Sequence, residues 1–153
     1  MIILYTSLIF SCVWLGVEMA KKLQAKEKFY SDMLGFLMEY EHNLSFVQKE
    51  YGAVVEEYAN HENVGEPFKK FIINPRESGA HREFLSAHEE RELLTIFCSL
   101  GKSDEYTETK IVEGQKLLVK ARLDESKKRA EKYSSLSIKL SFFVGVLLVL
   151  LLL

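Results

Sequence analysis

Charged side chains are absent from both ends of this chain of 153 residues. All 20 Lys and Arg residues lie between Lys21 and Lys139, and neither residues 1–17 nor residues 140–153 contain an Asp or a Glu. Because the apolar residues gather at the two ends, an ordinary soluble globular domain does not explain the composition. Each end is typical of a membrane segment.

Cysteine is also scarce, with Cys12 in the first apolar run and Cys98 in the charged middle. Disulfide frameworks need several cysteines in an oxidising compartment, so we interpret both thiols as packing groups. A strong positive charge is missing as well, since 22 acids face 20 bases. Non-specific binding to nucleic acid needs a basic field, and we therefore expect no nucleic-acid partner.

Motifs that carry chemistry are missing too. None of the histidines, His42, His61, His81 and His88, belongs to a two-histidine metal motif. The triplet Gly101, Lys102, Ser103 resembles the end of a phosphate-binding loop, but Ile96 stands where that loop needs glycine. We therefore predict no catalytic residue, no metal site and no cofactor site, and we do not expect an enzyme.

The two terminal runs are predicted to be transmembrane helices, at residues 1–20 and 136–153. A span needs roughly 20 residues, and the second run reaches that length by extending back past Lys139, whose long stem lets its ammonium group reach the interface. A cleaved signal peptide is the alternative for the first run. No Lys or Arg precedes it, and Glu18, Met19 and Ala20 make a poor cleavage sequence. We expect this helix to be retained.

Positive residues follow the first run and precede the second, from Lys21 to Lys28 and from Lys127 to Lys139. The positive-inside tendency therefore predicts that residues 21–135 are cytoplasmic and that both termini are extracytoplasmic.

The cytoplasmic part is predicted to be an all-α antiparallel bundle. Apolar residues recur every three or four positions from Tyr30 to Tyr58, which predicts one long helix. A homo-oligomeric coiled coil is one interpretation. The seam mixes Tyr, Met, Leu and Val and is widened by residues such as Phe46, which favours an intramolecular bundle.

Three further helices are predicted. Pro67 begins a short helix through Asn74, and a loop bracketed by Pro75 and Gly79 follows it. Ser86 and Glu89 have capping-box spacing, and Leu93, Leu94, Phe97 and Leu100 form the buried face of the next helix, which ends at Gly101. Ser103 or Asp104 caps a last helix that continues into the membrane, with Ile111, Gly114, Leu118 and Ala121 as its packed stripe.

Three stretches of the sequence resemble the stage III sporulation protein AB family. They are GVEMAKK after the first apolar run, LGKSD at residues 100–104, and the ending KYSSLSIKLSFFVGVLLVLLLL. The family favours Gly at the place of Ser141 and Gln at that of Glu108, so the chain departs from the pattern at these positions.

The resemblance implies a membrane-anchored platform or adaptor in the channel complex between mother cell and forespore. The family is similar to the cytoplasmic domain of the platform protein F of type II secretion systems. By this analogy the chain lies in the mother-cell membrane around the forespore. Its partners would be the lipid bilayer, a stage III sporulation protein AA-like ATPase and membrane subunits of the channel, and a homo-oligomer stays open. A homo-oligomeric membrane scaffold and a small-ligand sensor are the alternative functions.

The residues that we single out as interaction candidates lie in the two internal motifs. They are Glu18, Lys21, Lys22, Gly101, Ser103 and Asp104, and Lys139 is assigned to the membrane interface. Glu18 is also explained without a partner, because it can form an ion pair with Lys21 or Lys22. The alternative for Glu18 is a contact with a base of a neighbouring helix, such as Lys139.

Overall fold

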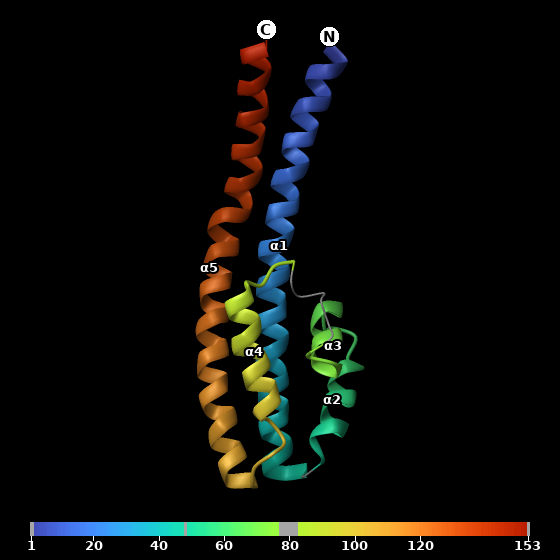
Figure 1. The fold of residues 1–153 in the computed structure, drawn as a ribbon, viewed down its shortest axis with the longest axis vertical. Helices are drawn as coiled ribbons and strands as arrows, with labels where there is room; N and C mark the ends of the chain where they lie inside the picture. The colour runs from blue at the N-terminus through green and yellow to red at the C-terminus, as the bar shows by residue number, and fades with distance from the viewer. Residues whose placement is uncertain (1, 48, 77–82, 153) are drawn as a thin grey trace. The chain divides into compact units, whose positions relative to one another are not determined.

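A computed structural model describes residues 2–47, 49–76 and 83–152. Within these residues the chain is all-helical and contains no strand, which confirms the predicted all-α class. The predicted loop glycine Gly79 and the histidine His81 lie outside the described residues. The elements, shown in Figure 1, are α1 (Ile2–His42), the π-helical turn η1 (Asn43–Val47), α2 (Tyr51–Ala59), α3 (Glu66–Ile73), α4 (Ala87–Ser99) and α5 (Glu105–Leu152).

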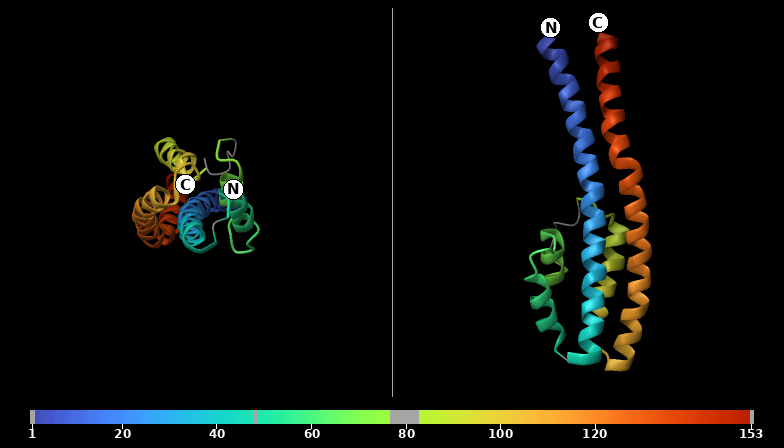
Figure 2. Two further views of the ribbon diagram at one scale, coloured as in Figure 1. Left: turned by 90° about the horizontal axis from the view of Figure 1, so that it is seen from below. Right: turned by 180° about the vertical axis from the view of Figure 1, so that it is seen from behind.

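The chain divides into two compact units, and α1 and α5 contribute to both. Unit 1 consists of residues 1–27 and 125–153, and unit 2 consists of residues 28–124. Within unit 1 the two helices lie side by side and run in opposite directions (Figure 1). Within unit 2, α1 lies between α5 on one side and the pair α2 and α3 on the other, as both views in Figure 2 show.

The prediction of a single helix from Tyr30 to Tyr58 is wrong, because the chain turns back between α1 and α2. The side chain of Asn43 closes this turn. Its Nδ2 donates to the carbonyl oxygen of Lys49 at 3.1 Å, and its Oδ1 accepts from the Lys49 N–H at 3.3 Å. A buried amide that satisfies both backbone groups of one residue stabilises a reversal that hydrophobic spacing does not report.

The reversal removes the basis for a coiled coil through residues 30–58. The apolar residues of α1 and α2 instead meet in one core, where the rings of Phe36 and Tyr58 are 5.4 Å apart. Phe46, which the sequence placed in the seam, is 77% exposed because it lies on the turn itself. The intramolecular bundle is therefore the interpretation that fits unit 2.

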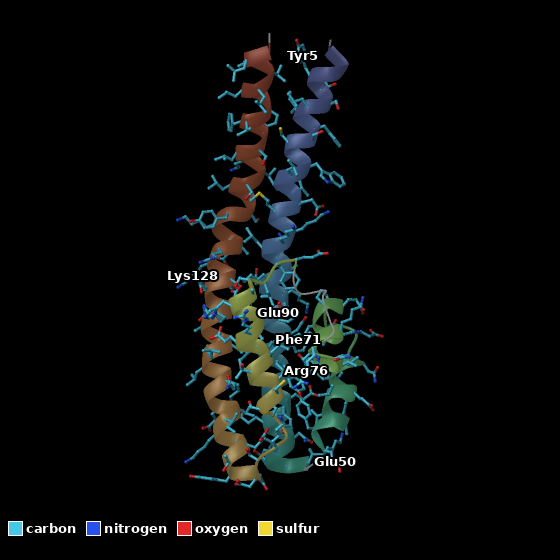
Figure 3. The ribbon with its side chains drawn as sticks, viewed as in Figure 1. Tyr5, Glu50, Phe71, Arg76, Glu90 and Lys128 are labelled. Atoms are coloured by element: carbon cyan, nitrogen blue, oxygen red, sulfur yellow. The ribbon has the colours of Figure 1, made fainter. Side chains whose placement is uncertain are left out.

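Aromatic rings fill the core of unit 2. Phe36 of α1 stacks on Phe97 of α4 at 5.7 Å. Phe71 of α3, which is labelled in Figure 3, meets Phe97 edge-to-face at 5.1 Å. Burying one such side chain contributes about 1.5–3 kcal/mol, and favourable ring geometry adds roughly 0.5–1.5 kcal/mol to a pair. The fully buried large side chains include Phe29, Tyr30, Met33, Phe36, Leu37, Tyr40, Phe68, Phe71 and Leu93.

A buried aspartate fixes the connection between α2 and α3. Asp32 Oδ2 accepts from the Gly65 N–H at 2.9 Å, and its Oδ1 accepts from Lys28 Nζ at 2.6 Å. The same ammonium donates to the carbonyl oxygen of Asn63 at 2.7 Å, while the Tyr58 hydroxyl donates to the main-chain oxygen of Asp32 at 2.7 Å. The α2–α3 loop is therefore bonded to α1 at several points.

The ends of α3 and α4 agree with the sequence. Pro67 lies in the first turn of α3, and the reciprocal capping box of Ser86 and Glu89 begins α4. The packed stripe predicted for the last helix is partly wrong, since Gly114 and Ala121 are exposed. Helix α5 instead buries Glu108, Val112 and Val119. This register differs from the predicted one because the carboxylate of Glu108 lies inside.

Candidate functional site

The LGKSD turn joins α4 to α5 and depends on a left-handed glycine. Gly101 has φ +72°, a conformation that non-glycine residues adopt only with strain. A Cβ atom at this position would lie 2.9 Å from Cβ of Tyr51, so the turn also needs the space that glycine leaves. The predicted helix end at Gly101 is confirmed, and a side chain is excluded there for two independent reasons.

Glu108 holds the turn from the inside of unit 2. Its Oε1 accepts from the Gly101 N–H at 2.5 Å and from the Tyr40 hydroxyl at 3.1 Å, and its Oε2 accepts from the Ser103 N–H at 3.3 Å. Glu108 is 1% exposed. A buried carboxylate is costly unless its lone pairs are satisfied, and these three donors supply that compensation.

Glu108 was missed as a site residue in the sequence. The signal that could have found it is its place in the series Glu108, Val112 and Val119, which follows helical spacing along the buried face of α5. An acid in an apolar register, one turn after a glycine-containing loop, indicates a carboxylate that accepts from the loop N–H groups.

The outer side of the turn is exposed. Asp104 caps α5, because its Oδ2 accepts from the Thr107 N–H at 3.2 Å. Hydrogen bonds from the hydroxyl and the N–H of Thr107 hold the pKa of the Asp104 carboxyl below its ordinary value. Lys102 and Ser103 are exposed beside it. The turn therefore presents a fixed acid and a base to the outside while Glu108 keeps its backbone in place.

Ion pairs tie α5 to its neighbours further along unit 2. Lys116 bonds Glu41 of α1, and Arg122 bonds Glu92 of α4 at 3.0 Å. An open groove of about 460 Å³ lies along α1 and α5 beside Lys116. It is lined by Leu34, Met38, Glu113, Lys116, Leu117 and Lys120.

The other predicted interaction residues belong to unit 1. Lys21 donates to Glu18 at 3.0 Å, and its ammonium lies 5.7 Å from the centre of the Trp14 ring. Glu18 thus has the local partner that the sequence offered it, and its contact with Lys139 stays a prediction. Such an exposed pair contributes roughly 0.2–1 kcal/mol. Lys22 and Lys139 are exposed. The candidates of GVEMAKK and those of LGKSD therefore fall in different units.

Small residues bring the two helices of unit 1 close together. A Cβ atom on Gly16 would lie 2.7 Å from Oγ of Ser141 and 3.0 Å from the carbonyl oxygen of Ser137. A Cβ atom on Gly145 would lie 3.3 Å from Cβ of Cys12. Close backbone approach at glycine and serine is typical of helices that associate within a membrane, where hydrophobic burial does not drive their contact.

Side chains that could hold a metal ion do not gather in the part of the chain that the structure describes. Groups of three or more His, Cys, Asp or Glu residues in ligating positions are absent there. Both cysteines are free thiols, and Cys12 packs against α5.

The outer half of α5 is the clearest membrane feature. Among the described residues one helix is long and apolar enough to cross a membrane, and it is α5, from Glu105 to Leu151. The most apolar 18 residues of that helix are 6% buried. Its exposed apolar side chains include Leu140, Phe142, Phe143, Val144, Leu147, Leu148, Leu150 and Leu151. The span predicted for the start of α1 stays a prediction.

Comparison with known proteins identifies the family. No curated protein and no solved structure matches the chain significantly. The family model described as stage III sporulation protein AB matches residues 47–153. The match includes LGKSD and the apolar ending, whereas GVEMAKK precedes it. Since the model covers more than half of the chain, the protein belongs to the stage III sporulation protein AB family.

Proposed function

We propose that this protein is a non-enzymatic, membrane-anchored platform of the channel complex between mother cell and forespore. The observation that carries the proposal is the outer half of α5, whose apolar side chains face outward with 6% of the most apolar stretch buried. Exposure of so large an apolar surface to water is unfavourable, whereas contact of the same surface with the lipid chains of a membrane is not. Family membership supplies the sporulation context.

Both ends of the chain cross the same membrane in this proposal, at residues 1–20 and 136–153. The close contact of Gly16 with Ser141 supports a paired, antiparallel crossing. The lysines that flank both segments support a cytoplasmic position for residues 21–135 and an extracytoplasmic position for both ends. In this proposal the cytoplasm is that of the mother cell. Cysteine labelling of intact cells tests this topology. A cysteine introduced in place of Lys102 or Lys127 should react with the thiol label only after the membrane is permeabilised.

The bundle serves as an adaptor for a cytoplasmic secretion-type ATPase, and the membrane helices bind channel subunits. The LGKSD turn supports the first part, because an exposed acid and base stand there on a backbone that Glu108 fixes. A rigid, polar loop can recognise a partner with little loss of conformational entropy on binding. In unit 1, Glu18 and the lysines that follow it form the polar group that we propose for contact with the channel subunits.

Affinity purification from sporulating cells tests the adaptor role. Asp104→Asn keeps a side-chain oxygen for the Thr107 N–H and removes the charge, so it separates contact from folding. If Asp104 contacts the ATPase, Asp104→Asn and Asp104→Lys both reduce the amount of ATPase that co-purifies. The control Glu113→Lys, on an exposed part of α5, does not reduce it. Glu18→Lys should reduce recovery of the channel subunits.

Full recovery of all partners with Asp104→Lys and Glu18→Lys would show that these residues are not contacts. A purified complex with one copy of the chain would remove the homo-oligomer that the sequence left open.

A further inference from the structure

We propose that the basic residues of unit 1 form a binding surface for the headgroups of anionic phospholipids. This inference rests on the membrane anchoring proposed above. Its residues, called the basic band here, are Lys21, Lys22, Lys127, Lys128, Arg129 and Lys132. All of them are exposed and all belong to unit 1.

Charge is distributed unevenly between the units. Unit 1 has eight Lys and Arg residues against four Glu residues, whereas unit 2 has 12 Lys and Arg against 18 acids. The chain as a whole is nearly neutral, so this asymmetry is invisible in its net charge. Within unit 1, Arg129 is paired with Glu125 at 2.7 Å and Lys21 with Glu18, which leaves the band with a net positive charge.

The register of α1 against α5 puts the two parts of the band on the same side of the Gly16 contact and at overlapping heights along the helix pair. Gly16 meets Ser137 and Ser141, and the helices are antiparallel, so residues after Gly16 lie level with residues before Ser137. At 1.5 Å per residue, Lys22 and Lys132 both lie about 8–10 Å from this contact, on the same side. Lys127 and Lys128 follow within roughly another 8 Å.

The band lies directly beside the exposed apolar surface. Met19 in α1 is 60% exposed, and Leu136 in α5 is 45% exposed. Tyr133 stands between that surface and the bases, with the Lys132 ammonium 5.2 Å from its ring centre. Tyrosine and lysine next to an apolar stretch are typical of the interface, where the headgroups begin. The bases are thus within about one Debye length of headgroup phosphates.

The arrangement around α5 favours lipid over a protein partner. Successive residues of a helix are turned by about 100°, so Lys127, Lys128 and Arg129 cover an arc of roughly 200° between the buried positions Ser126 and Ala130. A protein surface contacts one face of a helix, whereas headgroups surround it. Bases that fan out to every outward face fit a partner that surrounds the helix.

Trp14 provides a direct measurement. It is the single tryptophan of the chain, it is 58% exposed, and it lies on the apolar side of Lys21. The full-length protein is reconstituted with brominated phosphatidylglycerol or brominated phosphatidylcholine, and quenching of Trp14 fluorescence gives the relative association of the two lipids.

At low salt we expect phosphatidylglycerol to associate with the protein at least about fivefold more strongly than phosphatidylcholine does. A factor of about five is the effect of one fully effective lysine near the membrane surface. The preference should fall at high salt.

Lys127→Gln, Lys128→Gln and Lys132→Gln together should reduce the preference by about fivefold. The matched control is Lys70→Gln, Lys110→Gln and Lys120→Gln, which removes the same charge from exposed positions of unit 2 and should leave the preference unchanged. Equal quenching of the wild type by both lipids overturns the lipid proposal and keeps the anchoring. Absence of quenching by either lipid instead overturns the anchoring.

Discussion

The hydroxyl of Tyr40 donates to the carboxylate of Glu108 at 3.1 Å and thereby joins α1 to α5 across 68 positions of sequence. Both residues are almost fully buried. Burial, followed by the negative charge of Glu108, raises the pKa of Tyr40 above its ordinary value of 10. Tyr40 therefore stays protonated near neutral pH and remains a donor to the carboxylate that holds the LGKSD turn.

Replacing Glu108 with alanine should destabilise unit 2 by about 3 kcal/mol, because three buried donors lose their acceptor. Glu108→Gln should cost only about 1 kcal/mol. Its amide oxygen can still accept from Tyr40 and Gly101, and only the longest bond, from Ser103, is lost. Urea denaturation of the protein in detergent, followed by near-ultraviolet circular dichroism, measures both. Equal losses for the two variants would show that the carboxylate is not the organising group.

Gly101→Ala should destabilise the protein by about 2 kcal/mol, because the left-handed backbone disfavours a Cβ atom and Tyr51 occupies its place. Gly114→Ala is the control. Gly114 lies inside α5 with open space around it, so alanine should stabilise by about 0.5–1 kcal/mol. Thermal unfolding of the two variants should shift in opposite directions. A loss of the same size at both positions would contradict a special role for Gly101.

Much of the fold could be predicted from local signals. Ser86 and Glu89 begin α4 as their spacing predicts, and Gly101, in the left-handed region, follows the end of the same helix. These features depend on residues close together in sequence, so the capping residues can be recognised from the sequence alone. The uninterrupted course of α5 into the apolar ending follows in the same way.

The reversal at Asn43 could not be predicted from periodicity. The apolar positions continue in register from Met33 to Tyr58 through a turn, because both helices face one core and so repeat the same spacing. The inside place of Glu108 was hidden for a related reason. Its three donors come from α1 and from the turn. Donors that reach a side chain only through the fold cannot be predicted from a local sequence pattern.

Raised pH should weaken unit 2 through its buried tyrosines. Burial, followed by the charge of Asp32, raises the pKa of Tyr58 from 10.0 to about 12. The unfolded chain therefore releases this proton at lower pH than the folded chain does, so stability is full below pH 10 and falls as pH rises from about 10 toward 12.

Tyr58→Phe tests this by denaturation at pH 7 and at pH 11. It should cost about 1 kcal/mol at pH 7, through the lost bond to the Asp32 main-chain oxygen. The gap between wild type and variant should then narrow at pH 11, because the variant has no proton to lose at this position. A gap that stays constant would contradict the raised pKa.

The antiparallel register of unit 1 predicts a disulfide that the natural sequence lacks. A Cβ atom on Gly145 would lie 3.3 Å from Cβ of Cys12, close to the separation of about 3.5–4.5 Å found in disulfides. In a Cys98→Ser background, Gly145→Cys should therefore cross-link to Cys12 within one chain when a mild oxidant is added to membranes. Thiol alkylation with a maleimide polymer before and after reduction measures the bond.

Gly114→Cys in the same background is the control, because Gly114 has open space around it and belongs to unit 2. Both of its thiols should stay reactive toward the maleimide. If Gly145→Cys also leaves both thiols reactive, the two helices do not pair in this register, and the level assigned to the basic band would have to be abandoned with it. A cross-link between separate chains would show instead that α1 of one copy packs against α5 of another.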